Sequence, residues 1–308
     1  MPQKLVIIAD PGIDAAFAIA LAMHDPDLDL VGLLPTAGYV SAQQATLNCH
    51  ILVNHLDPRK WPRVGTALPV QYDVKPDDLH GPGGLGGIEY PCAIPHQQVP
   101  SDRLLTELVR IDPHELTIVV MGPCTVLATA LDREPDLLRR VERVVVLGGS
   151  YREPGNVSPV AEFHFACDPL AAQQVVQSSG QVQVIPLDQM RKLVFSPTDL
   201  LELPSPESRT SQFLRSMMPY AIRASSNLYG IEGFHLSAVL GVAAIADPGA
   251  IQFREVNMDV ETRGLLTRGM SVIDERPGGE AQPNVLMANQ IDQSRIKNYI
   301  RRILSAAT

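Results

Sequence analysis

Short runs of aliphatic and β-branched residues alternate along this chain with longer stretches in which apolar residues recur at helical spacing. The predicted strands are Leu5–Ala9, Leu30–Pro35, Leu116–Met121, Val144–Leu147 and Val182–Ile185. The predicted helices are Ile13–His24, Ser41–Leu56, Cys124–Leu131 and Pro169–Ser178. This alternation predicts an α/β fold, with an open, mostly parallel sheet and helices on both of its faces.

In such sheets ligands bind beyond the carboxyl ends of the strands, so the chemistry is expected in the loops that follow them. Those loops are Asp10–Gly12, Thr36–Tyr39, Met121–Pro123 and Gly148–Gly149. Two further stretches, Asp73–Pro95 and Leu203–Arg209, show neither helical nor strand periodicity. The first holds His80 among glycines, which favours an active-site loop over a domain linker. We therefore expect residues 1–308 to form a single domain.

Composition and charge narrow the class of protein. The 308 residues are 45% hydrophobic and 19% charged, which is typical of a globular protein. A net charge of -9 disfavours binding to nucleic acid or to anionic lipid. The sequence has no apolar run of the ~20 residues that span a bilayer, and its start lacks the pattern of a secretory signal. Four scattered cysteines complete the expectation of a soluble cytoplasmic protein with free, buried thiols.

Two carboxylates, Asp10 and Asp14, stand at the turn between the first strand and the first helix. Taken alone, Asp14 is explained as a residue that caps the helix by accepting backbone N–H bonds. Asp10 is explained in the same way as a turn residue before Pro11 and Gly12. An isolated pair of this kind is more often structural than catalytic.

The surrounding sequence changes that interpretation. The segment Val6–Ala16 is similar to the pattern D-x-D-P-G-x-D-D, and five further segments match one family in order. They are Leu79–Gly86, Gly122–Thr125, Gly155–Phe163 with Asp168-Pro169, Phe234–Leu236 and Gly264–Ser271. On these motifs the chain is identified as a divergent member of the nucleoside hydrolase family, the inosine-uridine preferring nucleoside hydrolases.

The resemblance implies a nucleoside-hydrolase-like, Rossmann-like fold with a mixed sheet, and an N-ribosidase activity in which water replaces the base of a nucleoside. It also implies a homo-dimer or homo-tetramer. In the family a calcium ion holds the nucleophilic water and the ribose diol, while an aspartate acts as general base. The expected partner is thus a small nucleoside or ribosyl ligand.

The family's residue roles transfer position by position. Asp10 matches the general base and a calcium ligand, and Asp14 matches the carboxylate that binds the ribose hydroxyls. Thr125 matches the residue whose backbone carbonyl contacts calcium. The remaining matches are Asn156 and Glu162 at the outer ribose hydroxyls, Phe163 beside them, His80 on the pocket wall and His235 as the acid near the leaving base.

The departures from the family concentrate on the calcium ligands. Ile8 replaces the first aspartate of the signature, Ala15 replaces the bidentate ligand, and Leu236 replaces the C-terminal ligand. Because calcium takes 6–8 oxygen ligands, Asp10 and one carbonyl are not expected to hold it, so we expect no metal and no cofactor. Glu232 is the one nearby carboxylate that could replace a ligand, although a solvent-facing loop residue is the simpler interpretation.

Ribose recognition is altered as well, since Tyr39 and His164 each replace a family asparagine. Tyr39 is expected to fill volume vacated by the ion or, alternatively, to form an aromatic platform for another ligand. Without a cation Asp10 and Asp14 would repel one another, so either His235 or His164 compensates or the pair has moved apart.

Two functional hypotheses remain. The chain is either a divergent hydrolase of ribonucleosides or related ribosyl compounds that works without calcium, or a catalytically silent protein that binds a ribose-containing small molecule. Dinucleotide binding is disfavoured, because the glycines from Gly81 to Gly87 do not open a helix after a strand.

Overall fold

The computed structural model describes residues 2–203, 208–276 and 282–307. Its main feature is a nine-stranded sheet in the order β10-β9-β11-β6-β5-β4-β1-β2-β3. The strands are β1 (Gln3–Ala9), β2 (Leu28–Pro35), β3 (Arg63–Val64), β4 (Leu116–Met121), β5 (Arg143–Leu147), β6 (Val182–Ile185), β9 (Ile251–Val260), β10 (Ser271–Asp274) and β11 (Val285–Ile291). A separate antiparallel pair, β7 (Val194–Phe195) and β8 (Phe234–His235), lies outside this sheet.

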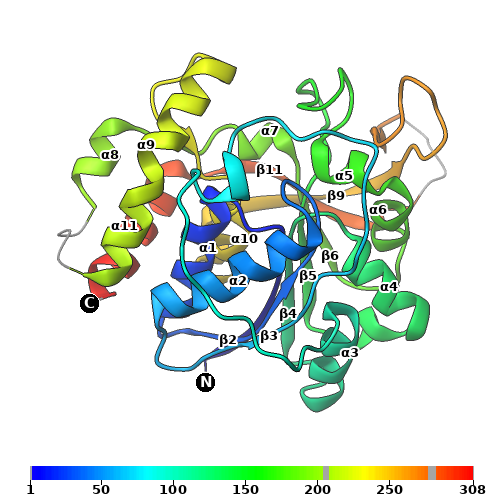
Figure 1. Cartoon of the computed structure of the whole chain (residues 1–308). Coiled ribbons are helices and arrows are strands. Elements are labelled where there is room, and N and C mark those ends of the chain that lie inside the picture. Colours follow the sequence, from blue (N-terminus) through cyan, green and yellow to red (C-terminus); the bar gives the residue numbers. More distant parts are fainter. Residues whose placement is uncertain (1, 204–207, 277–281, 308) are drawn as a thin grey trace.

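Helices follow most of the parallel strands and pack on the sheet (Figure 1). They are α1 (Ile13–His24), α2 (Ala42–Leu56), α3 (Ser101–Ile111), α4 (Thr125–Arg133), α5 (Phe163–Cys167), α6 (Pro169–Val176), α7 (Leu187–Met190), α8 (Pro197–Leu201), α9 (Arg209–Tyr229), α10 (Val239–Ala246) and α11 (Gln293–Ala306). Three short 3-10 helices are η1 (Pro82–Gly84), η2 (Leu137–Arg140) and η3 (Pro248–Ala250).

Strand β1 lies between β2 and β4, and its side chains alternate between two apolar cores. Leu5 and Ile7 belong to the core formed with α1, α2, α9, α10 and α11. Val6 and Ile8 belong to the core formed with α3, α4 and α6. A strand buried on both faces shows a continuous apolar run rather than alternation, which is why β1 was readable from the sequence.

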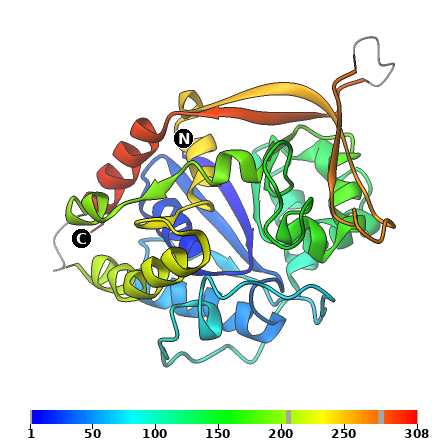
Figure 2. The same cartoon turned by 90° about the horizontal axis from the view of Figure 1, so that it is seen from above.

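The predicted α/β architecture is confirmed. Each predicted strand and helix is present, with ends that differ by at most two residues. The stretch Asp73–Pro95 contains no regular element longer than η1, and of the predicted loop Leu203–Arg209 residues 204–207 lie outside the described residues. The sheet is mixed because β9 runs antiparallel to both β10 and β11. The long strands β9 and β11 cross one side of the molecule in Figure 2.

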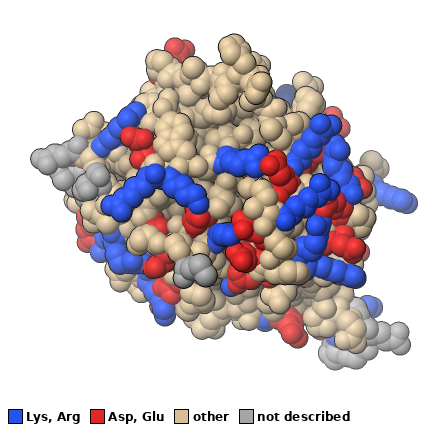
Figure 3. All heavy atoms as spheres, turned by 90° about the horizontal axis from the view of Figure 1, so that it is seen from below, with Lys and Arg blue, Asp and Glu red and all other residues tan. Residues whose placement is uncertain are grey.

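On the face shown in Figure 3, Lys and Arg side chains lie beside Asp and Glu side chains. Ion pairs such as Arg63 with Glu107 and Lys60 with Asp29 neutralise charge locally. None of the described helices is long and apolar enough to cross a bilayer. The four cysteines are free; three are buried as expected, whereas Cys92 is partly exposed.

The fold supports a prediction about Leu236, which is 0% exposed and belongs to the core beside α1 and α10. We expect Leu236→Asp to lower the free energy of unfolding by about 2–5 kcal/mol, because the carboxylate would be buried without a partner. Leu236→Met, which nearly conserves volume, should cost less than about 1.5 kcal/mol. Urea unfolding of both variants measures the difference, and equal stability of the two would contradict the placement of Leu236.

Candidate functional site

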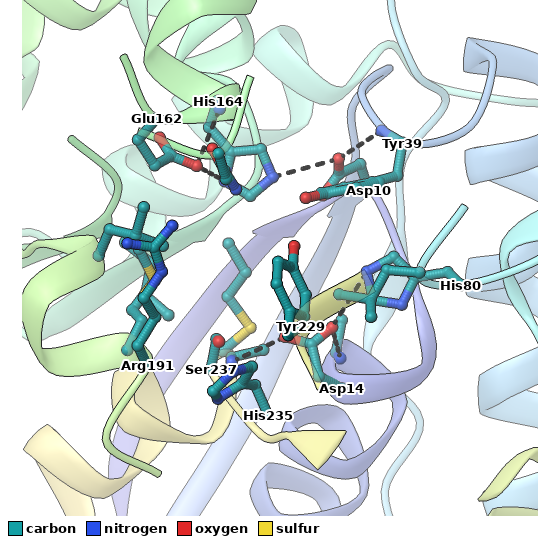
Figure 4. A pocket seen from close by; sticks show the side chains of 18 residues that line it. Asp10, Asp14, Tyr39, His80, Glu162, His164, Arg191, Tyr229, His235 and Ser237 are labelled. Atoms are coloured by element: carbon teal, nitrogen blue, oxygen red, sulfur yellow. Dashed lines mark hydrogen bonds and ion pairs between the residues drawn. The ribbon is translucent and has the colours of Figure 1, made fainter. Parts of the chain in front are cut away.

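A cavity opens at the carboxyl edge of the parallel strands, where the sequence placed the chemistry (Figure 4). Asp10 follows β1, Met121 ends β4 and Leu147 ends β5, and all three line the cavity. Arg191, from the segment after β6, and His235 of β8 line it as well. The β7–β8 pairing, in which Val194 faces His235, fixes the position of that histidine.

Asp10 is 3% exposed, and its two carboxylate oxygens have different surroundings. Oδ2 accepts a hydrogen bond of 2.8 Å from the backbone N–H of Tyr39. Oδ1 has no hydrogen-bond partner among the described residues and points into the cavity in Figure 4. The chain passes so closely that a Cβ on Gly38 would lie 1.9 Å from Oδ2, which explains a glycine at this position. One oxygen of Asp10 is held, and the other is available to a ligand.

His80 closes the N-terminus of α1. Its Nδ1 accepts a hydrogen bond of 3.2 Å from the backbone N–H of Ile13, one of the N–H groups that a helix start leaves unpaired. A Cβ on Gly12 would lie 2.6 Å from the imidazole ring, so this contact requires glycine. Since Nδ1 accepts, the ring proton is on Nε2, which lies 3.7 Å from Oδ1 of Asp14. The other oxygen of Asp14 accepts from the backbone N–H of Ala238.

His164 lies between two buried carboxylates. Its Nε2 is 3.4 Å from Oδ2 of Asp10, and its Nδ1 is 3.6 Å from Oε1 of Glu162. Burial lowers the pKa of His164, but the negative charges of Asp10 and Glu162 outweigh burial and raise the pKa to about 9. At neutral pH the imidazole is therefore a cation inside the site.

Glu162 and Asn156 both line the cavity, and both are also engaged by the backbone. The Glu162 carboxylate caps α5 by accepting from the N–H groups of His164 and Phe165, and it accepts a third hydrogen bond from Gly149. Oδ1 of Asn156 accepts from the N–H of Phe163. The contact of these side chains with ribose stays a prediction.

Three aromatic rings contact the ring of Tyr39. Its ring centroid lies 4.7 Å from that of His80, 4.3 Å from that of Phe163 and 5.8 Å from that of His164. Burial, followed by the charge of Asp77, raises the pKa of the Tyr39 hydroxyl, so the phenol is neutral. Tyr39 packs among these rings and lines the cavity. Phe163, at 2% exposure, does not line the cavity.

On the opposite side of the cavity His235 lies beside Tyr229, with ring centroids 5.7 Å apart. Burial first, and then the charge of Arg191, lowers the pKa of His235, while Asp14 opposes this shift. Its Nδ1 is buried and has no hydrogen-bond partner among the described residues. Tyr229 donates a hydrogen bond of 2.7 Å to Asp77, which ties α9 to the loop that carries His80.

Several cavity residues were missed from the sequence, among them Arg191, Tyr229 and Ala238. Arg191 donates to the backbone carbonyls of Pro154 and Gly155 and so fixes the segment before Asn156. It follows the predicted strand Val182–Ile185, so the rule that placed the other loops would have found it. Tyr229, at the end of α9, and the backbone N–H of Ala238 carried no such signal.

Thr125 and Glu232 lie outside the cavity as the structure describes it. The Thr125 hydroxyl donates to Asp168 and contacts Tyr72, while the Thr125 carbonyl accepts from the hydroxyl of Thr129. Glu232 is exposed to solvent, in agreement with its simpler interpretation.

The side chains at this site do not fit the calcium ion that the sequence resemblance implies. Ala15 contributes a methyl group to the cavity, Leu236 is in the core, and His164 lies against Asp10. Across residues 2–203, 208–276 and 282–307 there is no group of three or more His, Cys, Asp or Glu residues that could hold a metal ion. The oxygen-rich cage that calcium prefers is not formed here.

The sequence matches one protein family over nearly its whole length. Residues 5–298 match the family model described as inosine-uridine preferring nucleoside hydrolase. The chain is 31% identical over 280 residues to uridine nucleosidase 1 of Arabidopsis thaliana, covering 89% of this chain and 82% of the relative. It is 30% identical to the inosine-uridine preferring nucleoside hydrolase of Crithidia fasciculata, covering 90% of this chain and 89% of that protein.

Two solved structures of nucleoside hydrolases have the same fold as this chain. A plant nucleoside hydrolase, the PpNRh1 enzyme, superposes with a TM-score of 0.91 at 25% identity and 99% coverage of both chains. A purine-preferring ribonucleoside hydrolase from Gardnerella vaginalis superposes with a TM-score of 0.90, also at 25% identity and 99% coverage of both chains.

The pKa of His164 predicts how stability depends on pH. The pKa is raised from 6.5 to about 9 on folding, so the native state binds the proton more tightly. The resulting stabilisation is fully present below about pH 6.5 and is lost as the pH rises through about 9, on the order of a few kcal/mol in total. We expect the free energy of unfolding to fall across this window.

His164→Asn provides the reference for that measurement, because it removes the titrating ring and keeps a polar side chain. The variant should be less stable at pH 6.5 but should lose much less stability between pH 6.5 and about 9 than the original chain. Parallel pH profiles for the two proteins would show that His164 does not carry the linkage.

Proposed function

The chain belongs to the inosine-uridine preferring nucleoside hydrolase family, and on this basis we propose that it hydrolyses the N-glycosidic bond of a ribonucleoside or related ribosyl compound without calcium. The observation that carries the proposal is the free oxygen of Asp10, which faces a cavity lined by Asp14, His80 and Asn156. We further propose a single domain that acts on a small molecule in the cytoplasm as a homo-oligomer.

In this mechanism Asp10 is the general base. Oδ2 is held by the Tyr39 N–H and by His164, so the carboxylate keeps one orientation and presents Oδ1 to a water molecule. Water attacks the anomeric carbon while Oδ1 accepts its proton, and the bond to the base breaks as the ring oxygen stabilises positive charge. The products are ribose and the free base.

His235 is the proposed acid. The departing base takes up an electron pair and needs a proton, which the protonated imidazole would supply from the side of the cavity facing Asp14. The lowered pKa of His235 makes the imidazolium a stronger acid but reduces its population at neutral pH. The proton accepted by Asp10 returns to solvent after the sugar leaves, and His235 takes up a proton from solvent before the next turnover.

Ribose is proposed to lie between Asp14 and the Gly155–Phe163 segment. Asp14 would accept hydrogen bonds from the ring hydroxyls, and His80 holds this carboxylate from the side. Asn156 retains its amide N–H groups as donors, because only its Oδ1 is engaged by Phe163. Glu162 would act chiefly by keeping α5, and hence His164, in place.

A catalytically silent ribose-binding protein is the second candidate, and one observation favours it. Oδ2 of Asp10 is engaged by His164 and by the Tyr39 N–H, so part of this carboxylate serves the architecture of the site rather than a substrate. A protein that only binds ribosyl compounds would retain Asp14 and Asn156 with no need of a strong base. Equilibrium binding of ribose or inosine without any release of reducing sugar would favour this candidate.

The first test is the hydrolysis of inosine and uridine, followed by release of reducing sugar with and without a chelator. We expect turnover that chelator does not change, since the proposed base and acid are side chains. Asp10→Asn should lower the rate by about 10²–10⁴-fold. Glu232→Gln, which changes an exposed carboxylate outside the cavity, should retain the original rate. Turnover abolished by chelator would contradict the proposal.

The dependence of rate on pH tests the acid. Because His235 must be protonated to act and its pKa is lowered, kcat/KM should rise as the pH falls from 8 towards 5, by up to about tenfold per unit above that pKa. His235→Gln should give a lower, flat profile over this range. An unchanged slope in the variant would remove His235 from the mechanism.

A further inference from the structure

The position of His164 answers the question of what balances Asp10 in a member of this family without a calcium cage. We infer that the His164 side chain takes the place of the ion: it joins Asp10 to Glu162 and excludes a divalent cation from the site. The inference rests on the proposed function in its assignment of Asp10, but cation binding is measured without turnover. Figure 4 shows the ring between the two carboxylates.

The room beside Oδ2 of Asp10 is too small for an ion. Nε2 of His164 is 3.4 Å from Oδ2 of Asp10. Calcium binds oxygen at 2.3–2.6 Å, so an ion on this side of Oδ2 would lie only about 1 Å from the imidazole nitrogen. The Tyr39 N–H already occupies another direction around the same oxygen. An ion cannot bind Oδ2 between these groups unless the ring moves.

The Glu162 carboxylate already accepts hydrogen bonds from the backbone. Its Oε2 accepts from the N–H groups of Gly149 and Phe165, and its Oε1 accepts from the N–H of His164. At 3% exposure the carboxylate is buried, and turning it towards a metal would leave these three donors unpaired. Glu162 is therefore fixed as a partner of the imidazole ring and of α5.

The imidazole ring of His164 fits between the two carboxylates. Both nitrogens of His164 are buried and lack well-directed hydrogen bonds among the described residues, so the groups that act on the ring are the carboxylates at 3.4 and 3.6 Å and the backbone of Leu147. The edge-on contact with Tyr39 holds the ring plane. His164 is thus a positioning residue that keeps Oδ1 of Asp10 directed into the cavity.

The experiment asks whether removing the ring makes room for an ion. Ala15, which lines the cavity, is changed to aspartate to supply a second carboxylate, and this substitution is combined with His164→Asn. Calcium titration calorimetry and melting temperature are recorded for the original chain, Ala15→Asp, and Ala15→Asp with His164→Asn. The matched control is Ala15→Asp with His235→Asn, which removes an imidazole from the opposite wall of the cavity.

We expect about one calcium to bind only when His164 is removed, with a rise in melting temperature at calcium about 100-fold above Kd. The original chain, the single variant and the His235 control should show neither signal. Equal calcium binding by Ala15→Asp with His164 in place would overturn the inference. So would the failure of the folded double variant to bind.

A second measurement decides the case in which the double variant does not fold. His164→Gly leaves a space shaped for imidazole, so added imidazole should raise its melting temperature more than that of the original chain or of His235→Gly. Equal shifts in the three proteins would overturn the inference. Failure of the proposed hydrolysis is recognised separately, as the absence of sugar release from inosine or uridine by the original chain.

Discussion

The contact between Asp10 and His164 is the interaction on which the rest of the site depends. Asp10 is fixed because β1 lies within the sheet with both faces buried, which leaves the residue after the strand little freedom. His164 is fixed because it stands in the first turn of α5, whose start is capped by Glu162. Two rigid elements thus hold opposite charges together in a medium of low dielectric constant, where such contacts are strong.

The architecture could be predicted as far as its strands were buried on both faces. The continuous apolar runs of β1, β4, β5 and β6 identify a parallel core without further information. The later part of the chain gave weaker signals. Strand β9 exposes several of its side chains, and α9 contains Pro219, which breaks the usual helical pattern. These elements follow from tertiary packing rather than from local sequence.

The residues of the candidate site also differ in how far the sequence predicted their positions. Asp10, Asp14 and His80 could be placed because each sits in a short motif beside a predicted element, and all three line one cavity. The sequence left open whether His164 or His235 compensates the carboxylates, since sequence separation says nothing about which histidine reaches Asp10. The structure brings His164 to within 3.4 Å of that carboxylate and places His235 on the opposite wall.

The burial of Leu236 has a consequence for how this protein can change over evolutionary time. Leu236 is 0% exposed in the core, so its side chain contributes packing energy that a charged residue would lose. A substitution that places a carboxylate at Leu236 loses that packing and buries a charge before any ion is bound. Such a variant would be less stable than the present chain without a ligand, so stability alone disfavours it. Substitutions that preserve the fold are therefore expected to spare Leu236 and to fall on residues that pack less tightly.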